Sequence, residues 1–237
     1  MSNHGSRTAD GSGLVLVTGA TGNGGAEVVR ELTRRGTPLR AAVLDGADAE
    51  KRPGDVPWKR FAFDDPSTFA EALDQVDRVF LMRPPHMADA AAFAPFIAAT
   101  RGAGVRHVAF LSLLGAHRNP LAPHHHIEKR LRASGVPWTM LRPSFFMQNL
   151  TTTHLADLRC GRIVVPAGRG RTSLVDVRDV GAAAAVTLAG PGHSGRTYDL
   201  TGPAALTYEE CAGILSEALG RHIVYTRPSG RAFARHM

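Results

Sequence analysis

The sequence predicts an α/β fold with a doubly wound parallel sheet, and three observations support that prediction. Short aliphatic strands alternate with helical segments from residue 14 to about residue 141. A glycine-rich turn connects the first strand directly to the first helix. The 237 residues are enough for one sizeable core, and no apolar run approaches the ~18 residues of a membrane helix. We therefore expect a single soluble domain.

The expected elements follow from the spacing of apolar residues and from turn and capping residues. Strands are predicted at residues 14–17, 39–44, 58–63, 77–82, 105–111 and 137–141. Helices are predicted at 26–32, from about 65 to 73, at 88–103 and at 124–133. Asp65 is expected to cap the second of these helices. Parallel strands joined by right-handed helical crossovers form a doubly wound sheet.

The alternation changes beyond about residue 145, where we expect a small substrate-covering subregion of the same domain. The predicted pieces are a helix at 146–158, an extended segment at 161–166, a turn at 168–171, a helix beginning at 175–180, a strand at 198–202 and a helix at 207–220. Thr207 and Glu210 fit a capping box at the start of the last helix. Residues 1–12 are expected to be a disordered lead-in, 13–226 the domain, and 227–237 a C-terminal tail.

The turn after the first strand has the spacing Gly19-x-x-Gly22-x-x-Gly25. Gly19 would allow the tight turn, Gly22 the approach of a pyrophosphate to the backbone, and Gly25 close packing of helix on strand. Backbone N–H groups and the positive end of the helix dipole make such a turn an anion site. We predict a bound dinucleotide, with Thr21, Asn23 and Gly24 also in contact with it. The alternative is a glycine-rich turn that binds nothing.

The net charge of +7 and the pI near 10.2 raise the question of nucleic-acid binding. The arginines, however, are scattered, and only three lysines stand against 25 arginines. This composition is typical of a high-GC bacterial genome, and we interpret the excess charge as a solvated surface that attracts small anions. We expect a small-molecule substrate, with neither nucleic acid nor membrane as partner. A homodimer remains an open alternative to a monomer.

Cysteine and histidine usage does not suggest a metal site. Cys160 and Cys211 are far apart and lack metal-ligand spacing, which favours reduced thiols in the cytoplasm. His124, His125 and His126 are consecutive on a predicted helix, so their side chains point about 100° apart and cannot all bind one ion. We predict no bound metal.

Taken together, these motifs resemble the NmrA-like branch of the atypical short-chain dehydrogenases/reductases. The likeness covers about residues 13–226 and is carried by residues 18–25, 111–112, 124–128, 134–139, 141–149, 175–180 and 201–203. It implies a Rossmann fold that binds NAD(P). Members of this branch often reduce quinones or small carbonyl compounds, and some sense redox state without catalysis.

One departure from the wider superfamily concerns catalysis. The usual Tyr-x-x-x-Lys pair is absent, and His124 and Glu128 stand at the matching spacing, one helical turn apart. His124 would donate the proton, with Glu128 orienting its charged form, and Ser112 would donate a hydrogen bond to the substrate. The alternatives are an ordinary helix-surface pair worth ~0.3–0.5 kcal/mol and a serine that satisfies a loop amide.

The choice of cofactor depends on the end of the second strand. Relatives that prefer NADP usually place an arginine there to bind the 2′-phosphate. In this chain the place is taken by Leu44, followed by Asp45, and an aspartate there favours a free ribose hydroxyl. NAD is therefore slightly favoured over NADP, although Arg40, Lys51 and Arg52 could still reach a phosphate.

The resemblance also assigns other contacts to ends of strands, where open α/β sheets bind ligands. Asp64 would accept a hydrogen bond from the adenine amino group. Arg83 and Pro84 would line the cofactor groove, and Pro143, Ser144 and Phe145 would lie along the nicotinamide. The substrate would be contacted by Phe146, Gln148 and Asn149, although the rings of Phe145 and Phe146 could instead belong to the core.

We therefore expect an oxidoreductase that transfers hydride from NAD(P)H to a quinone, carbonyl or imine. A non-redox isomerase or cyclase on the same fold, acting in a biosynthetic pathway, and a nucleotide-sensing regulator are the alternatives. The C-terminal substrate-covering region is expected to be abbreviated, because the chain ends soon after residue 226. An open pocket would suit a flat polycyclic substrate, unless a second subunit covers it.

Overall fold

The computed structural model describes residues 13–44, 50–52 and 54–236, and the chain divides into two compact units. Unit 1 contains the described residues up to Pro143 together with Arg178–Asp199. Unit 2 contains Ser144–Val177 and the residues from Leu200 onward. The boundary at residue 144 lies where the sequence changes its alternation of strands and helices. The expected lead-in at residues 1–12 lies outside the described residues.

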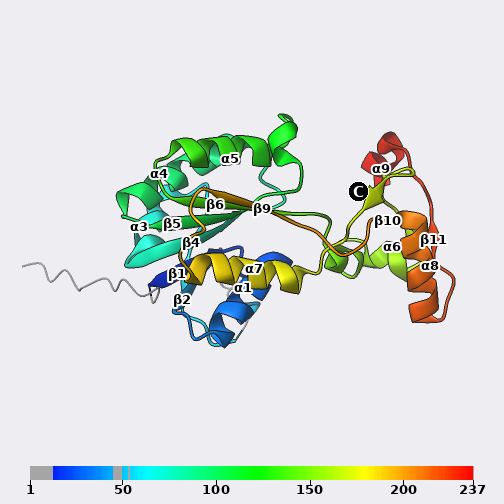
Figure 1. The fold of residues 1–237 in the computed structure, drawn as a ribbon, viewed down its shortest axis with the longest axis horizontal. Coiled ribbons are helices and arrows are strands. Elements are labelled where there is room, and N and C mark those ends of the chain that lie inside the picture. Colours follow the sequence, from blue (N-terminus) through cyan, green and yellow to red (C-terminus); the bar gives the residue numbers. More distant parts are fainter. Residues whose placement is uncertain (1–12, 45–49, 53, 237) are drawn as a thin grey trace, which may run out of the picture. The chain divides into compact units, whose positions relative to one another are not determined.

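Unit 1 is built on a seven-stranded sheet with the strand order β3-β2-β1-β4-β5-β6-β9 (Figure 1). The first six strands in the chain pair in parallel, as predicted. The chain runs outward from β1 through β2 to β3 and then restarts at β4 on the other side of β1. The strands are β1 (Leu14–Thr18), β2 (Leu39–Val43), β3 (Trp58–Arg60), β4 (Val76–Met82), β5 (His107–Leu111), β6 (Trp138–Pro143) and β9 (Arg196–Leu200).

Helices cover both faces of this sheet (Figure 1), which makes it doubly wound. One face carries α1 (Asn23–Arg34) and α7 (Val177–Ala189). The other face carries α3 (Phe69–Leu73), α4 (Ala94–Gly102) and α5 (Pro123–Ala133). Short 3-10 turns precede three of these helices, at Pro66–Thr68, Ala90–Phe93 and Ala116–Arg118. The predicted helix at 88–103 is therefore a 3-10 turn followed by a shorter α-helix.

An aromatic cluster fills the space between β3, α3 and α4. Five phenylalanine rings pack there with centroids 4.6–5.7 Å apart, namely Phe61, Phe63, Phe69, Phe93 and Phe96. The predicted strand at 58–63 is shorter than expected, since β3 ends at Arg60 and the next phenylalanines enter the core. Asp65 accepts a hydrogen bond from the Ser67 backbone N–H at 3.2 Å, so its predicted capping role is confirmed.

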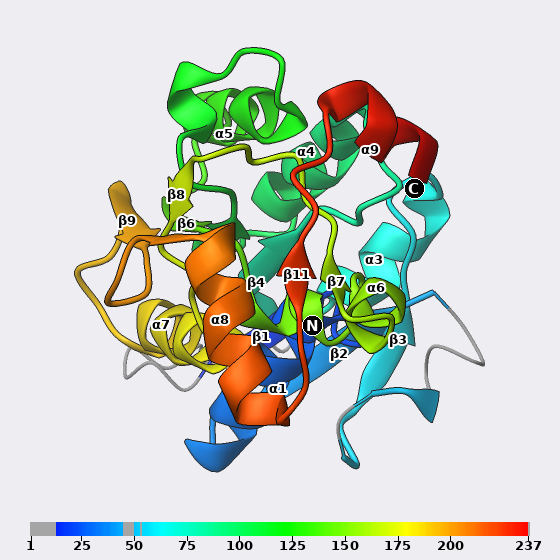
Figure 2. The same ribbon diagram turned by 90° about the vertical axis from the view of Figure 1, so that its right-hand side faces the viewer.

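Unit 2 consists of short elements around its own apolar cluster. Strand β7 (Arg162–Ile163) pairs in parallel with β11 (Val224–Tyr225), and β8 (Arg171–Thr172) pairs antiparallel with β10 (Leu206–Thr207). The helices are α6 (Leu155–Arg159), α8 (Tyr208–Leu219) and α9 (Gly230–His236), and Figure 2 shows β11 beside β7 and α8. The predicted capping box is confirmed, because Thr207 and Glu210 exchange both hydrogen bonds.

Two expectations for unit 2 differ from the structure. The predicted helix at 146–158 is replaced by a 3-10 turn at Met147–Leu150 and the short α6. The expected tail from residue 227 includes helix α9, none of whose residues is buried. Within the described part of the chain, no helix is long and apolar enough to cross a membrane.

Candidate functional site

The glycine turn after β1 is held tightly by the surrounding protein. Gly19 has φ +62°, in the left-handed region that favours glycine. A Cβ on Gly25 would lie 2.1 Å from the carbonyl oxygen of Gly19, so only glycine fits there. Thr18 supports the turn from below, because its Oγ1 donates to the Phe80 carbonyl at 3.0 Å and accepts from the Met82 N–H at 2.8 Å. The turn is thereby fixed to both β1 and β4.

Gly22 differs from its two neighbours in the motif. A Cβ built on it would meet no described atom closer than 3.4 Å, and its φ of −88° suits any residue. The fold therefore does not itself require glycine at this position. Gly22 is also the N-cap of α1 and has no side chain to cap that helix. The first turn of α1 contains Asn23, Gly24 and Gly25. Its N-terminus has no side-chain cap among the described residues and adjoins the pocket that Gly22 lines.

A pocket of about 300 Å³ opens beside this turn, at the carboxyl ends of the central strands. It lies where the strand order reverses between β1 and β4, which is where open α/β sheets bind ligands. Six of the residues predicted to contact the nucleotide line it: Gly19, Thr21, Gly22, Leu44, Asp64 and Pro84. Asp45, the other residue on which the choice of cofactor depended, lies outside the described residues.

Arg83 holds in place three residues that line the pocket. Its Nη1 donates to the carbonyls of Pro84, Pro85 and Met87 at 2.9, 3.1 and 2.6 Å, and these three residues line the pocket. Burial lowers the pKa of the guanidinium. The Nε of Arg83 is buried and has no hydrogen-bond partner among the described residues.

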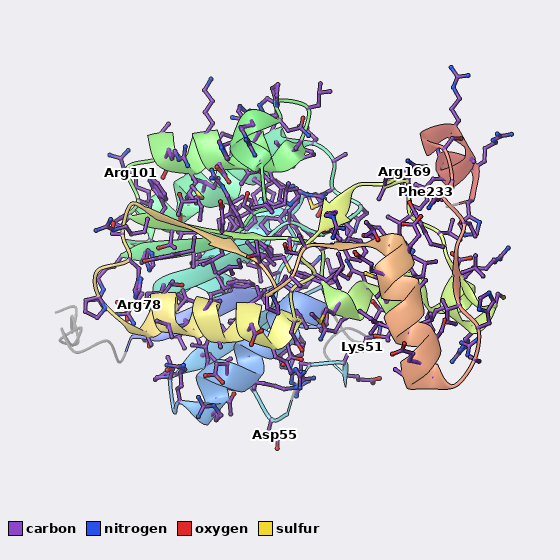
Figure 3. The ribbon with its side chains drawn as sticks, turned by 45° about the vertical axis from the view of Figure 1, so that its right-hand side comes forward. Lys51, Asp55, Arg78, Arg101, Arg169 and Phe233 are labelled. Atoms are coloured by element: carbon purple, nitrogen blue, oxygen red, sulfur yellow. The ribbon has the colours of Figure 1, made fainter. Side chains whose placement is uncertain are left out.

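The cations proposed as alternative phosphate ligands are placed as follows. The Nη1 of Arg40 donates to the carbonyls of Ala72 and Asp74 at 3.0 and 2.8 Å, where it caps the end of α3. Arg40 is therefore committed to the fold, which corrects the expectation that it could reach a phosphate. Arg52 donates from Nε to the Val56 carbonyl at 3.2 Å. Lys51 lies in the segment between β2 and β3 (Figure 3).

A buried network joins β5, α5 and β6. Ser112 Oγ donates to Glu128 Oε1 at 2.6 Å, and Arg142 donates to both carboxylate oxygens of Glu128 at 2.8 and 2.6 Å. Glu128 is only 2% exposed. Burial by itself would raise the pKa of Glu128, but the hydrogen bonds from Arg142 and Ser112 outweigh it and lower the pKa. Glu128 is thus an ionised partner in a buried ion pair.

The expected pair of His124 and Glu128 does not form. The Nδ1 of His124 is buried without a hydrogen-bond partner among the described residues, and its ring stacks on Phe110 with centroids 6.1 Å apart. Burial, and next the charge of Arg83, lower the pKa of His124 to about 4. The imidazole is neutral near pH 7, so the expectation of a charged His124 held by Glu128 is corrected. The reason is that Arg142, from a neighbouring strand, binds the carboxylate instead.

Ser112 and Arg142 both have roles that differ from the sequence-based expectation. The Ser112 hydroxyl is expected to donate to a substrate, but in the structure its hydrogen is donated to Glu128. The role of Arg142 was not predicted from the sequence. A signal was present, since a charged residue within the mostly apolar strand at 138–143 needs a buried counter-charge. Pro143 is buried, and its carbonyl accepts from the Leu114 N–H at 2.9 Å.

The remaining predicted residues belong to unit 2. Ser144 Oγ donates to the Ser173 carbonyl. Phe145 packs against His154 and Tyr208, with ring centroids 6.0 and 6.1 Å away, which favours the core interpretation of this ring.

The amide of Gln148 is also engaged within unit 2. Its Nε2 donates to Asp176 at 2.9 Å, and its Oε1 accepts from the Val177 N–H at 3.0 Å. The expectation that this amide faces a substrate is corrected by these two bonds. Phe146 and Asn149 are half-buried, and their role as substrate contacts remains a prediction.

Comparison with known proteins now adds to this geometry. The model of the NmrA-like family matches residues 11–236. The NAD(P)H azoreductase of Xenophilus azovorans is 36% identical over 222 residues, covering 90% of this chain and 76% of that protein. Quinone oxidoreductase 2 of Escherichia coli is 29% identical over 228 residues, covering 93% and 80%.

Two solved structures match closely in fold. The NADPH-dependent quinone oxidoreductase of Escherichia coli, complexed with NADPH, has a TM-score of 0.82 at 29% identity and covers 94% of this chain and 81% of that one. The Citrobacter sp. triphenylmethane reductase, complexed with NADP(H), has a TM-score of 0.80 at 27% identity and covers 95% and 82%. Both hold the 2′-phosphorylated nucleotide, so they give no support to the slight preference for NAD. With its glycine turn, its switch-point pocket and a family match over nearly its whole length, the chain belongs to the NmrA-like family.

Proposed function

We propose that this chain is an NAD(P)H-dependent reductase that passes hydride to quinones, azo compounds and similar flat conjugated acceptors. The observation that carries the proposal is the open pocket beside the glycine turn. The turn offers an uncapped helix N-terminus for the pyrophosphate, and Asp64 lines the pocket as an acceptor for the adenine amino group. When bound, the nucleotide supplies a hydride from its nicotinamide ring.

The groups expected to act in catalysis favour acceptors that need no acid from the enzyme. His124 is neutral near pH 7, and Ser112 and Glu128 are engaged with each other and with Arg142. A simple ketone requires a proton on its oxygen as the hydride arrives. A quinone or a cationic dye spreads the incoming charge over its conjugated system, so water can supply any proton later. The names of the azoreductase, quinone oxidoreductase and triphenylmethane reductase relatives support the same class.

We infer that both NADPH and NADH serve as the nucleotide. The azoreductase, at 36% identity, is named for NAD(P)H. At the end of β2 the pocket carries the neutral Leu44, and Arg40 is committed to α3. With Arg40 engaged and a neutral side chain at this rim, we expect only a modest difference in kcat/KM between the two nucleotides.

The test is a turnover assay with the purified chain. Naphthoquinones, azo dyes and simple ketones are offered with NADPH or NADH, and oxidation of the nucleotide is followed by its absorbance. We expect turnover with the conjugated acceptors and little with the ketones. Absence of calorimetric binding of either nucleotide would overturn the proposal. Tight binding without any turnover would replace it with the nucleotide-sensing alternative, and product formation without nucleotide oxidation with the isomerase alternative.

A further inference from the structure

Two buried side-chain atoms in the described part of the chain lack a hydrogen-bond partner, namely Arg83 Nε and His124 Nδ1. A buried polar atom left unpaired costs about 1–3 kcal/mol, and native proteins pair nearly all of them. The two residues lie at neighbouring strands, because Arg83 directly follows β4 and the His124 ring stacks on Phe110 of β5, which pairs with β4. Two unpaired atoms in one region indicate a common missing partner.

Their place in unit 1 suggests what that partner is. Arg83 directly follows β4, and His124 lies in the first turn of α5, which follows β5. The pocket that contains Asp64 extends over the ends of β2 and β3 and reaches the segment after β4, and β5 is the next strand beyond β4. A dinucleotide with its adenosine over β2 and β3 crosses the glycine turn and continues toward β4 and β5. Arg83 and His124 therefore lie on the path of the other half.

The chemistry of the two atoms narrows the choice further. Arg83 Nε can only donate, and its orientation is fixed by the three carbonyls that hold Nη1. A neutral imidazole offers one donor nitrogen and one acceptor nitrogen. Because the pKa of His124 is lowered to about 4, His124 adds no second positive charge that would call for a phosphate. The fitting partner is an uncharged group with an acceptor oxygen and a polar hydrogen.

We propose that Arg83 Nε and His124 Nδ1 jointly bind the nicotinamide-bearing half of the nucleotide, through a ribose hydroxyl or the carboxamide. This inference rests on the proposed function. It makes His124 a nucleotide-binding residue instead of the proton donor. Phe110, on which the imidazole stacks, and the carbonyls around Arg83 keep both groups in position before the nucleotide arrives.

The test compares two ligands that differ in the nicotinamide half. Calorimetry measures the Kd of NADPH and of adenosine 2′,5′-bisphosphate, which lacks the nicotinamide ribose and ring. His124→Phe keeps a ring that stacks on Phe110 but removes both nitrogens. We expect it to weaken NADPH binding about three- to ten-fold, the effect of one hydrogen bond, and to leave bisphosphate binding within about two-fold.

Further variants separate a binding role from a structural one. His124→Asn places an amide close to the position of Nδ1 and is expected to restore most of the lost NADPH affinity. Arg83→Lys, which loses the Nε donor and also the Nη1 contacts to the pocket wall, is expected to weaken NADPH more than the bisphosphate. His126→Phe is the matched control, because this exposed neighbour contacts the Pro120 carbonyl and the His125 ring and does not line the pocket, and both affinities should stay unchanged.

The outcomes are distinct from those of the proposed function. If wild-type protein binds neither ligand, the proposed function fails. If wild-type protein binds NADPH and His124→Phe binds both ligands equally well, the two buried atoms are hydrated by water and this inference alone is overturned. It is also overturned if the variant weakens both ligands to the same extent.

Discussion

Arg142 holds Glu128 with two hydrogen bonds, and both side chains are buried, with 6% of Arg142 and 2% of Glu128 exposed. The pair fixes α5 against β6, and Ser112 adds a contact from β5. Its existence also explains why His124 does not pair with Glu128, because the carboxylate one helical turn away is directed to the guanidinium. A buried ion pair contributes little net stability compared with an apolar pair, but removing one partner leaves a buried charge.

Arg142→Met should therefore destabilise the protein by about 3–5 kcal/mol in the free energy of unfolding, measured by urea denaturation at pH 7.5. Arg132→Met is the matched control, because Arg132 reaches Glu128 at 3.4 Å with a 43%-exposed side chain. We expect it to cost about 1 kcal/mol or less. The double variant Glu128→Leu, Arg142→Met should recover much of the loss. Equal losses for the two arginines would contradict this account of Glu128.

The glycine turn and the core strands could be predicted because their signals are local. The aliphatic run before Gly19 and the glycine spacing after it are contiguous in the sequence. The partner of Glu128 could not be predicted in this way, since Arg142 is 14 residues away on a separate strand. Helical spacing shows that His124 shares a face with Glu128, but it does not show which cation competes for the carboxylate. Gln148 was misjudged for the same reason, because its partners Asp176 and Val177 lie in a distant segment.

Gly22→Ala and Gly25→Ala should have different effects, although both glycines belong to one motif. At Gly25 the new Cβ would lie 2.1 Å from a backbone oxygen, so α1 must move and the variant should be strongly destabilised. At Gly22 the nearest atom is 3.4 Å away, so we expect a cost of about 1 kcal/mol or less. Nucleotide affinity should nevertheless fall at least about ten-fold in Gly22→Ala, because the methyl group occupies the space proposed for the pyrophosphate. The measurements are thermal unfolding and calorimetry with NADPH. Unchanged affinity in a folded Gly22→Ala variant would place the pyrophosphate elsewhere.

Asp64 and Asp65 are adjacent, yet we expect substitutions to separate binding from stability. Asp64→Ala should weaken NADPH and adenosine 2′,5′-bisphosphate equally, by about three- to ten-fold, because it removes one acceptor from the adenosine pocket. Asp65→Ala should leave both affinities unchanged and cost about 1 kcal/mol of stability, because it removes the cap that accepts from Ser67. Calorimetry and urea denaturation on the same preparations give both numbers. A reversed pattern would show that the adenine lies against Asp65.

His107 and His124 should make stability fall between pH 6.5 and pH 4, and His154, whose pKa is also lowered by burial, adds to the same trend. Burial, followed by the charges of Arg78 and His193, lowers the pKa of His107 to about 4, and burial and Arg83 do the same for His124. The unfolded chain binds these protons near pH 6.5, whereas the native protein does not, so the free energy of unfolding decreases as the pH falls through this window. Each histidine contributes at most about 3 kcal/mol. Glu128 acts in the same direction only at lower pH, because its lowered pKa keeps the carboxylate ionised.

Urea denaturation at pH 7.5, 6 and 5 measures the slope, and NMR titration should show neither His107 nor His124 protonating above pH 5. His124→Phe should flatten the slope, and an unchanged slope in that variant would mean that His124 titrates normally in the folded protein.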